Sequence, residues 1–575
     1  MNGLRISDFG LRNEKSLFLH VASNTNIFAA FSASLSSLSP GSMAKSKSQS
    51  PVVTFGSFLP GIVQHPRTGL ALAAAYALVL LYAALTFHVV GDYGIETDFF
   101  WSYVPSARQF LQGTIEIENF HGPAYPVVLG MISYLFGDFF RAGVVLSILA
   151  ASCTLFLSYS LFRKLTSPAS AVLGTLLIAV NPVFVQYSYS AGTDMMFFAL
   201  VAGSAYFLFR NSPQRYANIA FSAVFAGIAY LTRYNGVFVV VAVPAVLFLV
   251  NPDQASLKRR AIAAGLFLGT FFLTILPWGM YCLLERGSFF YNKNYLNIAY
   301  EMYAKGTMTW DQYWYKASET YTSLAGVLFS DPGRFLTTVA GNIGDHGLGD
   351  MGVLVGWQAG IFTLAGIGVA IKERISREGA GFLVYSLVFF SVLLLVFYSE
   401  RFSLFLLTGY TFLALIAFSW SKLQTLRFGR NLTLGGILVV VVIAWTFLRS
   451  YEFNRVNIDS GPKEILTIAD WFKRTVPSDP EAIVLTRKPH AAYYLNMKMG
   501  GFPYVDTYEE LLQEARKANA RYLYFGIMEA AMRPQFQSLL DPRNARPGLR
   551  PLVYTNAPPA VLYEITPLDT TGKGE

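Results

Sequence analysis

Long apolar runs constrain the fold of this chain more strongly than any other feature of its sequence. From about Gly69 onward they follow one another at lengths of about 15–24 residues, near the length that an α-helix needs to cross the hydrocarbon core of a bilayer. We expect about eleven such spans, near residues 69–90, 142–162, 169–187, 195–209, 216–232, 236–250, 261–284, 352–371, 380–398, 402–420 and 431–449. The runs therefore predict an α-helical, polytopic membrane protein.

The composition agrees with this prediction and excludes several other classes of protein. Of the 575 residues, 53% are apolar and only 14% are charged, whereas a soluble globular chain carries about 25% charged residues. The same apolar content excludes an intrinsically disordered chain. Cys153 and Cys282 both lie in apolar runs, where cysteine is typically a small core residue and not part of a disulfide or a metal site.

The distribution of basic residues predicts how the chain is oriented in the membrane. Alternate connections between the spans are basic, namely Arg163/Lys164, Arg210/Arg215, Lys258/Arg259/Arg260, Lys372/Arg374/Arg377 and Lys422/Arg427/Arg430. Because basic loops remain in the cytoplasm, we place these connections and the N-terminus inside. The long loops 91–141 and 285–351, the connection 188–194 and the tail after residue 450 then lie outside an inner (cell) membrane. The net charge of +9, which alone would suggest nucleic-acid binding, becomes mainly a topology signal, and we expect no nucleic-acid partner.

These features divide the chain into three parts. Residues 1–68 are expected to be a partly disordered cytoplasmic extension, in which Met43 is a candidate for the true start. Residues 69–450 form the membrane domain, and residues 451–575 form a soluble extracytoplasmic α/β domain. Its expected elements are helices at 465–474 and 508–518, strands at 482–486 and 521–525, and a closing hairpin of 551–554 with 560–565. Without a glycine-rich phosphate loop after a strand, this domain is interpreted as a cap or an acceptor-docking module.

Acidic and aromatic residues gather in the first outer loop. They are Asp92, Glu96, Asp98, Glu116, Glu118 and His121, beside Trp101, Tyr103 and Tyr125. Carboxylates next to a membrane can remove a proton from a hydroxyl group or hold a divalent cation near a phosphate. The alternative is a solvated acidic loop whose aromatic side chains lie at the membrane interface.

Three further charged residues lie at the outer ends of predicted spans. Asp194 follows a helix break at Asn181-Pro182, and a carboxylate there is costly unless it is paired or faces a polar cavity. Arg233 and Arg401 depart from the positive-inside pattern, and arginine binds phosphate bidentately without losing its charge. The structural alternatives are an N-cap for Asp194, snorkelling for the arginines and an ion pair of Arg401 with Glu400.

The combination is more specific than its members. Asp98, Asp194, Arg233 and Arg401 all fall on one side of the membrane under a topology that other residues determine. We therefore expect the four side chains to meet in one outer pocket that binds a lipid-linked phosphate. A carboxylate there would activate an acceptor hydroxyl, while arginine or a metal would neutralise the departing phosphate.

Four motifs resemble the membrane-embedded GT-C glycosyltransferases, in particular the family 39-like group related to protein mannosyltransferases and the aminoarabinose transferase of lipid A. They are D-x4-Y-x3-A-x5-G from Asp98 followed by HGPAYPVVLG, then NPVFVQYSYSAGTD, GIAYLTRYNG and SERFSLFLL. Together they cover roughly residues 69–450. Many members of the group also carry an α/β tail on the outer side. The sequence departs from the usual motifs at Gly122, where the group has proline, and at Phe402, where it has tyrosine.

The resemblance implies a GT-C bundle that transfers a sugar, with inversion, from a polyprenyl-phosphate donor to a glycan, glycolipid or protein acceptor. Asp98 would be the catalytic base, with Glu96 competing for that position, and Asp194 would be a second catalytic acid that positions the acceptor or a divalent cation. Arg233 and Arg401 would bind the donor phosphate. His121 would support the loop or bind a cation. Apart from the resemblance, the residues themselves make Glu96 and His346 further candidates for loop support or cation binding, and Tyr103 and Tyr125 candidates for aromatic contacts with the substrate.

The second outer loop and two other function classes complete the expectations. DHGLGD, which contains His346, is typical of a flexible polar flap over an active site.

A transporter or lipid flippase would also explain many spans, but it predicts paired charges at mid-membrane depth and internal repeats. A non-catalytic scaffold whose tail binds a partner is the third interpretation.

Overall fold

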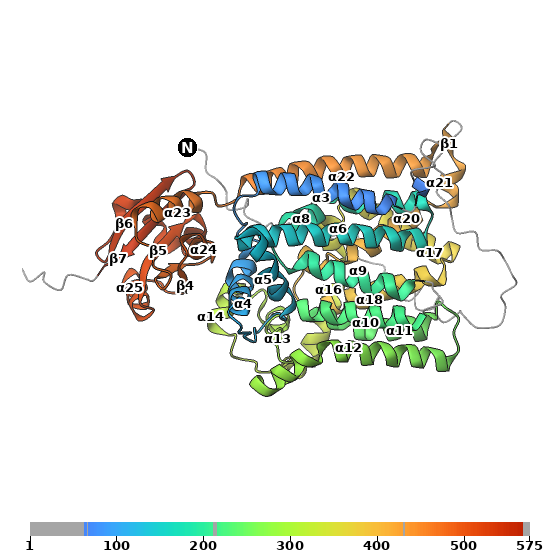
Figure 1. Cartoon of the computed structure of the whole chain (residues 1–575), viewed down its shortest axis with the longest axis horizontal. Helices are drawn as coiled ribbons and strands as arrows, with labels where there is room; N and C mark the ends of the chain where they lie inside the picture. The colour runs from blue at the N-terminus through green and yellow to red at the C-terminus, as the bar shows by residue number, and fades with distance from the viewer. Residues whose placement is uncertain (1–62, 66, 211–214, 429–431, 567–575) are drawn as a thin grey trace, which may run out of the picture.

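The computed structural model describes residues 63–65, 67–210, 215–428 and 432–566. These residues form a bundle of helices and, beyond one end of it, a smaller part that contains a sheet (Figure 1). The predicted fold class is confirmed to this extent. The expected cytoplasmic extension 1–68 and the candidate start at Met43 lie almost entirely outside the described residues.

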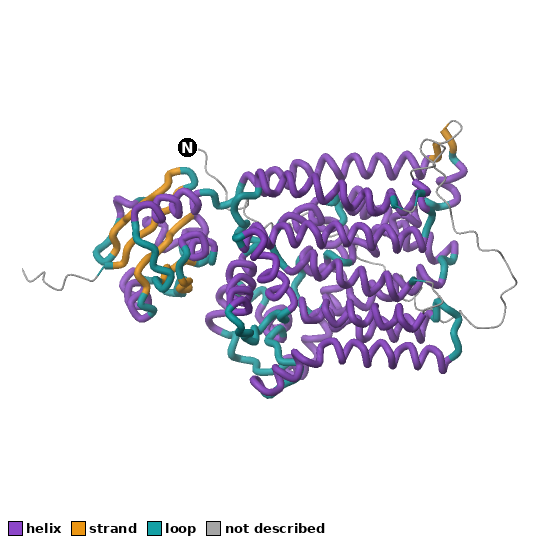
Figure 2. The backbone as a smooth tube through the Cα atoms, in the orientation of Figure 1, coloured by secondary structure: helices purple, strands orange, loops and turns teal. Residues whose placement is uncertain are grey.

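Each predicted span coincides with a helix or with consecutive helices. The bundle consists of α3 (Thr68–Phe87), α6 (Phe139–Leu165), α7 (Pro168–Ala179), α8 (Pro182–Tyr189), α9 (Thr193–Phe209), α10 (Arg215–Thr232), η3 (Tyr234–Val237), α11 (Phe238–Ala245), η4 (Val246–Val250), α12 (Leu257–Arg286), α17 (Trp357–Glu373), α18 (Arg377–Leu393), α19 (Glu400–Ser403), α20 (Leu406–Phe418) and α22 (Leu434–Asp459). The helices run alongside one another (Figure 2). The predicted junction at 450–451 lies inside α22, so the change in composition precedes the end of the helix.

Within the described residues, four helices are long and apolar enough to cross a membrane, and the bent pair α7–α8 would add a fifth. The count of about eleven spans is therefore not confirmed by length and composition, because many of the predicted runs fold into short or broken helices. The break between α7 and α8 is where Asn181-Pro182 predicts it: Asn181 accepts a hydrogen bond from the Phe184 amide, and Pro182 occupies the first position of α8.

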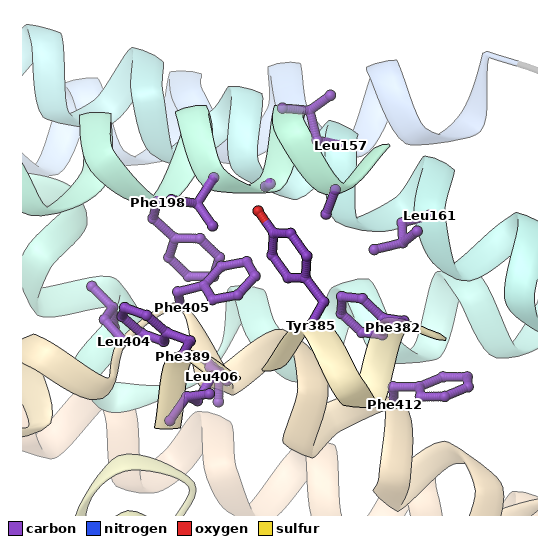
Figure 3. Close-up of a cluster of buried hydrophobic side chains, with 14 of the residues drawn as sticks. Leu157, Leu161, Phe198, Phe382, Tyr385, Phe389, Leu404, Phe405, Leu406 and Phe412 are labelled. Atoms are coloured by element: carbon purple, nitrogen blue, oxygen red, sulfur yellow. The ribbon is translucent and has the colours of Figure 1, made fainter. Parts of the chain in front are cut away.

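Aromatic and aliphatic side chains fill the centre of the bundle. Phe198 from α9 packs against Phe405, which precedes α20, and Phe405 in turn contacts Tyr385 and Phe389 from α18 (Figure 3). The ring centroids of Phe389 and Phe405 are 5.5 Å apart and nearly perpendicular, an arrangement that aromatic pairs favour. This packing joins α9 to α18 and to the segment between α19 and α20.

Helices also form the two long loops that were predicted to lie outside, and several of these helices lie at the end of the bundle next to the sheet (Figure 1). The first loop contains η2 (Phe99–Tyr103), α4 (Val104–Leu111) and α5 (Ala124–Phe136). The second contains α13 (Tyr295–Ala299), η5 (Tyr300–Ala304), α14 (Trp310–Lys316), α15 (Leu324–Ser330) and α16 (Pro332–Gly349), and η6 (Asp350–Leu354) follows.

The expected flap DHGLGD is instead the end of α16 and the start of η6. His346 is buried, and its Nε2 lies 3.1 Å from the carbonyl oxygen of Val396. A Cβ at Gly349 would lie 2.6 Å from the ring of Tyr398. The glycine therefore allows close packing within a helix, and the prediction of a flexible loop from DHGLGD is wrong.

The C-terminal part contains a five-stranded sheet in the order β4-β3-β5-β7-β6. Its elements are α23 (Glu464–Thr475), β3 (Ile483–Thr486), α24 (His490–Leu495), β4 (Lys498–Gly501), α25 (Tyr508–Lys517), β5 (Ala520–Gly526), α26 (Ile527–Met532), β6 (Leu549–Asn556) and β7 (Pro559–Ile565). Strand β3 pairs in parallel with β4 and β5, whereas β7 is antiparallel to β5 and β6. The expected small α/β fold and its closing hairpin are confirmed.

Candidate active site

Two acids and two arginines from four separate segments meet at the end of the bundle next to the C-terminal part. Arg401 in α19 donates from Nε to both carboxylate oxygens of Asp194, each at 3.0 Å. Its Nη1 donates to Oδ2 of Asp98 at 2.7 Å. Arg233, between α10 and η3, pairs with Asp194 through Nη1. The structure thus brings together the four residues that were expected to share one pocket.

Burial distinguishes the two acids. The side chain of Asp194 is only 4% exposed, and those of Arg233 and Arg401 are each 15% exposed, whereas Asp98 retains 53%. A buried charge must be paired and hydrogen-bonded to be tolerated, and two carboxylates balance two guanidinium groups here. Asp194 therefore forms the base of the cluster, and Asp98 lies at its mouth, open to a second molecule.

The N-cap alternative for Asp194 is not what the structure contains. The N-cap of α9 is Gly192, which provides no side-chain cap, and Asp194 lies within the first turn. A carboxylate in the first turn is stabilised by the helix dipole. The hydroxyl oxygen of Thr193 accepts a hydrogen bond from Arg233 at 3.3 Å, so the start of α9 also orients the arginine.

The alternatives for the arginines are also settled by geometry. Both guanidinium groups are bound to carboxylates of the cluster, so neither side chain snorkels. Arg401 pairs with Asp98 and Asp194, whereas the alternative prediction was an ion pair with Glu400. The guanidinium carbon of Arg233 lies 5.5 Å from the ring centroid of Phe402. An aromatic face stabilises a cation at this distance, which gives the ring at position 402 a role that does not need the hydroxyl of tyrosine.

Glu96 has a different environment from Asp98. It is fully buried, accepts hydrogen bonds from the backbone amides of Asp92 and Ala191, and lies 3.1 Å from Nε2 of His88. Its oxygens are therefore engaged within the protein. Glu96 connects the first loop to the segment that precedes α9, and Asp98 is the acid that faces the arginines.

His121 supports the loop from the other side. Its Nδ1 donates to the carbonyl oxygen of Gly122 at 3.0 Å, so Nε2, 2.6 Å from Oγ of Ser102, is the acceptor. Burial lowers the pKa of His121 and keeps the ring neutral. A Cβ at position 122 would lie 2.1 Å from the carbonyl oxygen of Leu231. Gly122 therefore permits a close backbone approach that places His121 beside the turn with Arg233.

The predicted substrate aromatics are buried. Tyr103 is 6% exposed and Tyr125 is not exposed at all, and their rings are 5.1 Å apart. Tyr125 is enclosed by the protein here, and its role as a substrate contact stays a prediction. The hydroxyl of Tyr103 lies 3.4 Å from Oγ1 of Thr193, so this residue connects η2 to the start of α9.

The electrostatics of the cluster favour an ionised Asp98. The surrounding protein removes water from the carboxyl group and would raise its pKa, but the charge and hydrogen bond of Arg401, with Arg233 and Lys488 further away, lower the pKa of Asp98 below 3.8. The carboxylate is thus unprotonated at neutral pH, as a general base must be.

The described residues do not form a ready-made ligand set for a divalent cation. Within the described parts of the chain, no group of three or more His, Cys, Asp or Glu side chains is arranged to hold a metal ion. Both carboxylates of the cluster are bound to arginine, Glu96 is bound to backbone amides, and His346 lies in α16 against Val396. The cation role expected for Glu96, His121 and His346 has no ligand set in this arrangement.

Sequence reasoning missed two groups near the site. His88, at the end of α3, faces Glu96. Lys488, from the C-terminal part, donates to the carbonyl oxygen of Tyr93 at 2.9 Å and to Oγ1 of Thr97 at 3.0 Å. Nothing in the pattern around either residue marks it, because each acquires its partner only through the tertiary fold.

Comparisons with known proteins agree with this geometry. Residues 120–281 match the family model described as dolichyl-phosphate-mannose-protein mannosyltransferase. No curated protein matches the chain by sequence. The fold is similar to that of ArnT from Cupriavidus metallidurans bound to undecaprenyl phosphate, with a TM-score of 0.55, 13% identity, and coverage of 87% of this chain and 98% of that chain.

Two archaeal structures are similar to a comparable degree. AglB, the oligosaccharyltransferase of Archaeoglobus fulgidus, in complex with an inhibitory peptide and a dolichol-phosphate has a TM-score of 0.52 at 14% identity, covering 87% of this chain and 75% of that one. The oligosaccharyltransferase of the same organism with Zn and sulfate has a TM-score of 0.54 at 13% identity, covering 82% and 69%. These structures confirm a GT-C-type fold, and the match over residues 120–281 agrees with the predicted resemblance to the protein mannosyltransferases.

Proposed function

We propose that this enzyme transfers a sugar from a polyprenyl-phosphate donor to an acceptor hydroxyl at the outer face of the membrane, by inverting displacement. The observation that carries the proposal is the exposed Asp98 carboxylate, bound through Arg401 to a buried acid–arginine pair. The matching mannosyltransferase model and the polyprenyl phosphates bound to ArnT and AglB support a lipid-linked donor.

Arg401 and Arg233 are proposed to bind the donor phosphate. Arginine presents a fixed fork of N–H groups that matches phosphate oxygens. Asp194, whose carboxylate is occupied by both guanidinium groups, would orient them and would not touch the acceptor. An arriving phosphate would compete with Asp98 for Nη1 of Arg401, releasing the carboxylate towards the acceptor.

Asp98 is proposed to act as the general base. It would take the proton from the acceptor hydroxyl as the acceptor oxygen forms a bond to the anomeric carbon. The bond from that carbon to the phosphate oxygen would break on the opposite face, and polyprenyl phosphate would leave with its charge neutralised by the arginines. In this proposal the two guanidinium groups supply the positive charge that neutralises the departing phosphate.

The bilayer and the acceptor complete the set of partners. The positive-inside pattern places the acid–arginine cluster and the C-terminal part outside, with the N-terminus in the cytoplasm. The donor lipid would lie in the outer leaflet of the cell membrane. The acceptor would be a glycan, a glycolipid or a protein, and the peptide bound to AglB supports a protein among these.

Transfer by purified protein in proteoliposomes tests the proposal. Radiolabelled polyprenyl-phosphate sugars are supplied with outer-envelope glycan, glycolipid or protein acceptors, and incorporation is measured. We expect Asp98→Asn to insert normally and to lower transfer by roughly 10²–10⁴-fold, the usual contribution of a general base. Glu116→Gln, at an exposed acid of the same loop, is the control with unchanged transfer.

The same assay separates the alternatives. Label that crosses the bilayer without being incorporated would contradict the enzyme and support a transporter or flippase. Near-normal transfer by Asp98→Asn would contradict the assignment of the base.

A further inference from the structure

The C-terminal part makes specific contacts with the segment that carries Asp98. Lys488 lies in the turn between β3 and α24, and its Nζ donates to the carbonyl oxygen of Tyr93 and to Oγ1 of Thr97 at 2.9 and 3.0 Å. Thr97 directly precedes Asp98, and its hydroxyl also donates to the carbonyl oxygen of Tyr93 at 2.6 Å. One ammonium group therefore closes the turn that ends at the proposed base.

Neighbours of Lys488 extend this contact along the same segment. Nε2 of His490 lies 3.1 Å from the carbonyl oxygen of Asp92, and the amide of Gly91 donates to the hydroxyl of Tyr494 at 3.3 Å. The ring of Phe100 lies 4.6 Å from that of His490. Residues 91–100 thus contact the C-terminal part through Gly91, Asp92 and Phe100. The same segment contacts the residues before α9 through Glu96, which accepts a hydrogen bond from the amide of Ala191.

A second, independent contact attaches the C-terminal part to the other outer loop. Asp311 in α14 accepts from Arg487 at 2.6 Å and from Arg533 at 2.8 Å. Arg533 is only 3% exposed, so this ion pair is largely shielded from water. We therefore expect the C-terminal part to stay attached to the bundle when the contact at Lys488 is removed.

We propose that Lys488 is a positioning residue for sugar transfer, which fixes the turn 93–97 so that the Asp98 carboxylate stays at the mouth of the acid–arginine cluster. The C-terminal part would then be a component of the active site and not only a cap. This inference rests on the proposed function for its kinetic consequences, but its structural content, the fixed turn, can be measured without any substrate.

The charge of Lys488 gives the contact a pH dependence. Burial and the neighbouring Arg487 lower the pKa of Lys488 to about 8, against the opposing effects of Asp98, Asp92 and Glu529. His490 beside it stays neutral, since burial lowers its pKa to about 3. Below pH 8 the ammonium group is charged and binds both oxygens, and as the pH rises through 8 that charge is lost.

Three variants of the full-length protein test the inference: Lys488→Met, Lys488→Arg and the control Lys498→Met, an exposed lysine on β4. Hydrogen–deuterium exchange of the peptide covering 91–101 is measured in nanodiscs. Loss of a hydrogen bond from a charged group is expected to increase exchange roughly 10-fold in Lys488→Met, while Lys488→Arg and Lys498→Met stay close to wild type. Unchanged exchange in Lys488→Met would overturn the proposal.

Kinetics with a polyprenyl-phosphate sugar provide the second readout. We expect kcat to fall roughly 10-fold in Lys488→Met with KM for the donor unchanged, and Lys488→Arg to restore it. Wild-type kcat should fall as the pH rises through about 8, while Lys488→Arg retains its activity there. A rise in KM alone, or the same alkaline fall in Lys488→Arg, would overturn the positioning role. If wild type transfers no sugar, the proposed function fails, and the exchange result still decides the inference.

Discussion

Arg401 binds the two acids of the site with different parts of one guanidinium group. Nε donates to both oxygens of Asp194, and Nη1 donates to Asp98. A planar fork can do this without changing its conformation, whereas an ammonium group is a point charge on a flexible stem. At the scale of single residues, the site therefore depends on the shape of arginine as much as on its charge.

Arg401→Lys tests this dependence on shape. The lysine keeps the charge but cannot reach both acids in the same way, so we expect kcat/KM to fall roughly 10- to 100-fold, the effect of losing a hydrogen bond between charged groups. Arg455→Lys, at an exposed arginine paired with Glu452, is the matched control. Wild-type kinetics in Arg401→Lys would show that charge alone suffices.

The acid limb of the pH–rate profile tests the electrostatic environment of Asp98. The pKa of Asp98 lies below its ordinary value because the charge and hydrogen bond of Arg401 outweigh the removal of water by the surrounding protein. The carboxylate stays ionised as the pH falls to about 4, so wild-type activity should show no loss from this group above that pH. In Arg401→Gln, the removal of water by the surrounding protein still raises the pKa of Asp98, and the charge that lowers it most is gone. Asp98 should then become protonated at a higher pH, so the residual activity should fall at a higher pH than in wild type. An acid limb at the same pH as in wild type would contradict the pairing of Asp98 with Arg401.

Helices and turns explain which parts of the fold could be predicted. Apolar runs predict helices because a membrane demands both length and apolarity, and every predicted span contains helix. Breaks within a run were predictable only at Asn181-Pro182, where a cap and a proline coincide. The helix α16 was missed because its sequence is rich in glycine, as a flexible loop often is. In the structure at least one of these glycines, Gly349, allows close packing against Tyr398.

The turn at Gly122 provides a test at the scale of elements. A Cβ there would lie 2.1 Å from the carbonyl oxygen of Leu231, and such overpacking typically costs about 1–3 kcal/mol. We expect Gly122→Ala to lower the Tm of the purified protein and to lower transfer, because the segments of His121 and Arg233 are pushed apart. Gly269→Ala, with open space around the position, should do neither. A Gly122→Ala protein as stable and active as wild type would contradict the close approach.

The whole molecule brings together groups that lie far apart in the sequence. That Asp98, Asp194, Arg233 and Arg401 lie at one end of the bundle could be predicted, because the alternation of basic loops between the spans assigns all four to the same side. Which oxygen each guanidinium group binds could not, since Asp98 and Arg401 are 303 positions apart. Lys488 was beyond prediction for the same reason: its partners belong to another part of the chain.

Thiol labelling tests the proposed orientation of the whole molecule. In a Cys153→Ala, Cys282→Ala background, Lys498→Cys on the C-terminal sheet and Lys258→Cys in a basic loop provide two exposed positions. A membrane-impermeant maleimide added to intact cells or spheroplasts should label the first and not the second until the membrane is permeabilised. The reverse pattern would place the site in the cytoplasm and contradict transfer at the outer face.

The position of a bound polyprenyl phosphate tests the central claim most directly. An experimental structure of the full-length protein with this lipid would locate the phosphate. We predict that its oxygens lie within about 3 Å of the guanidinium groups of Arg401 and Arg233, with the Asp98 carboxylate released from Nη1 and facing the space for the acceptor. A phosphate bound away from both arginines would contradict the proposed site.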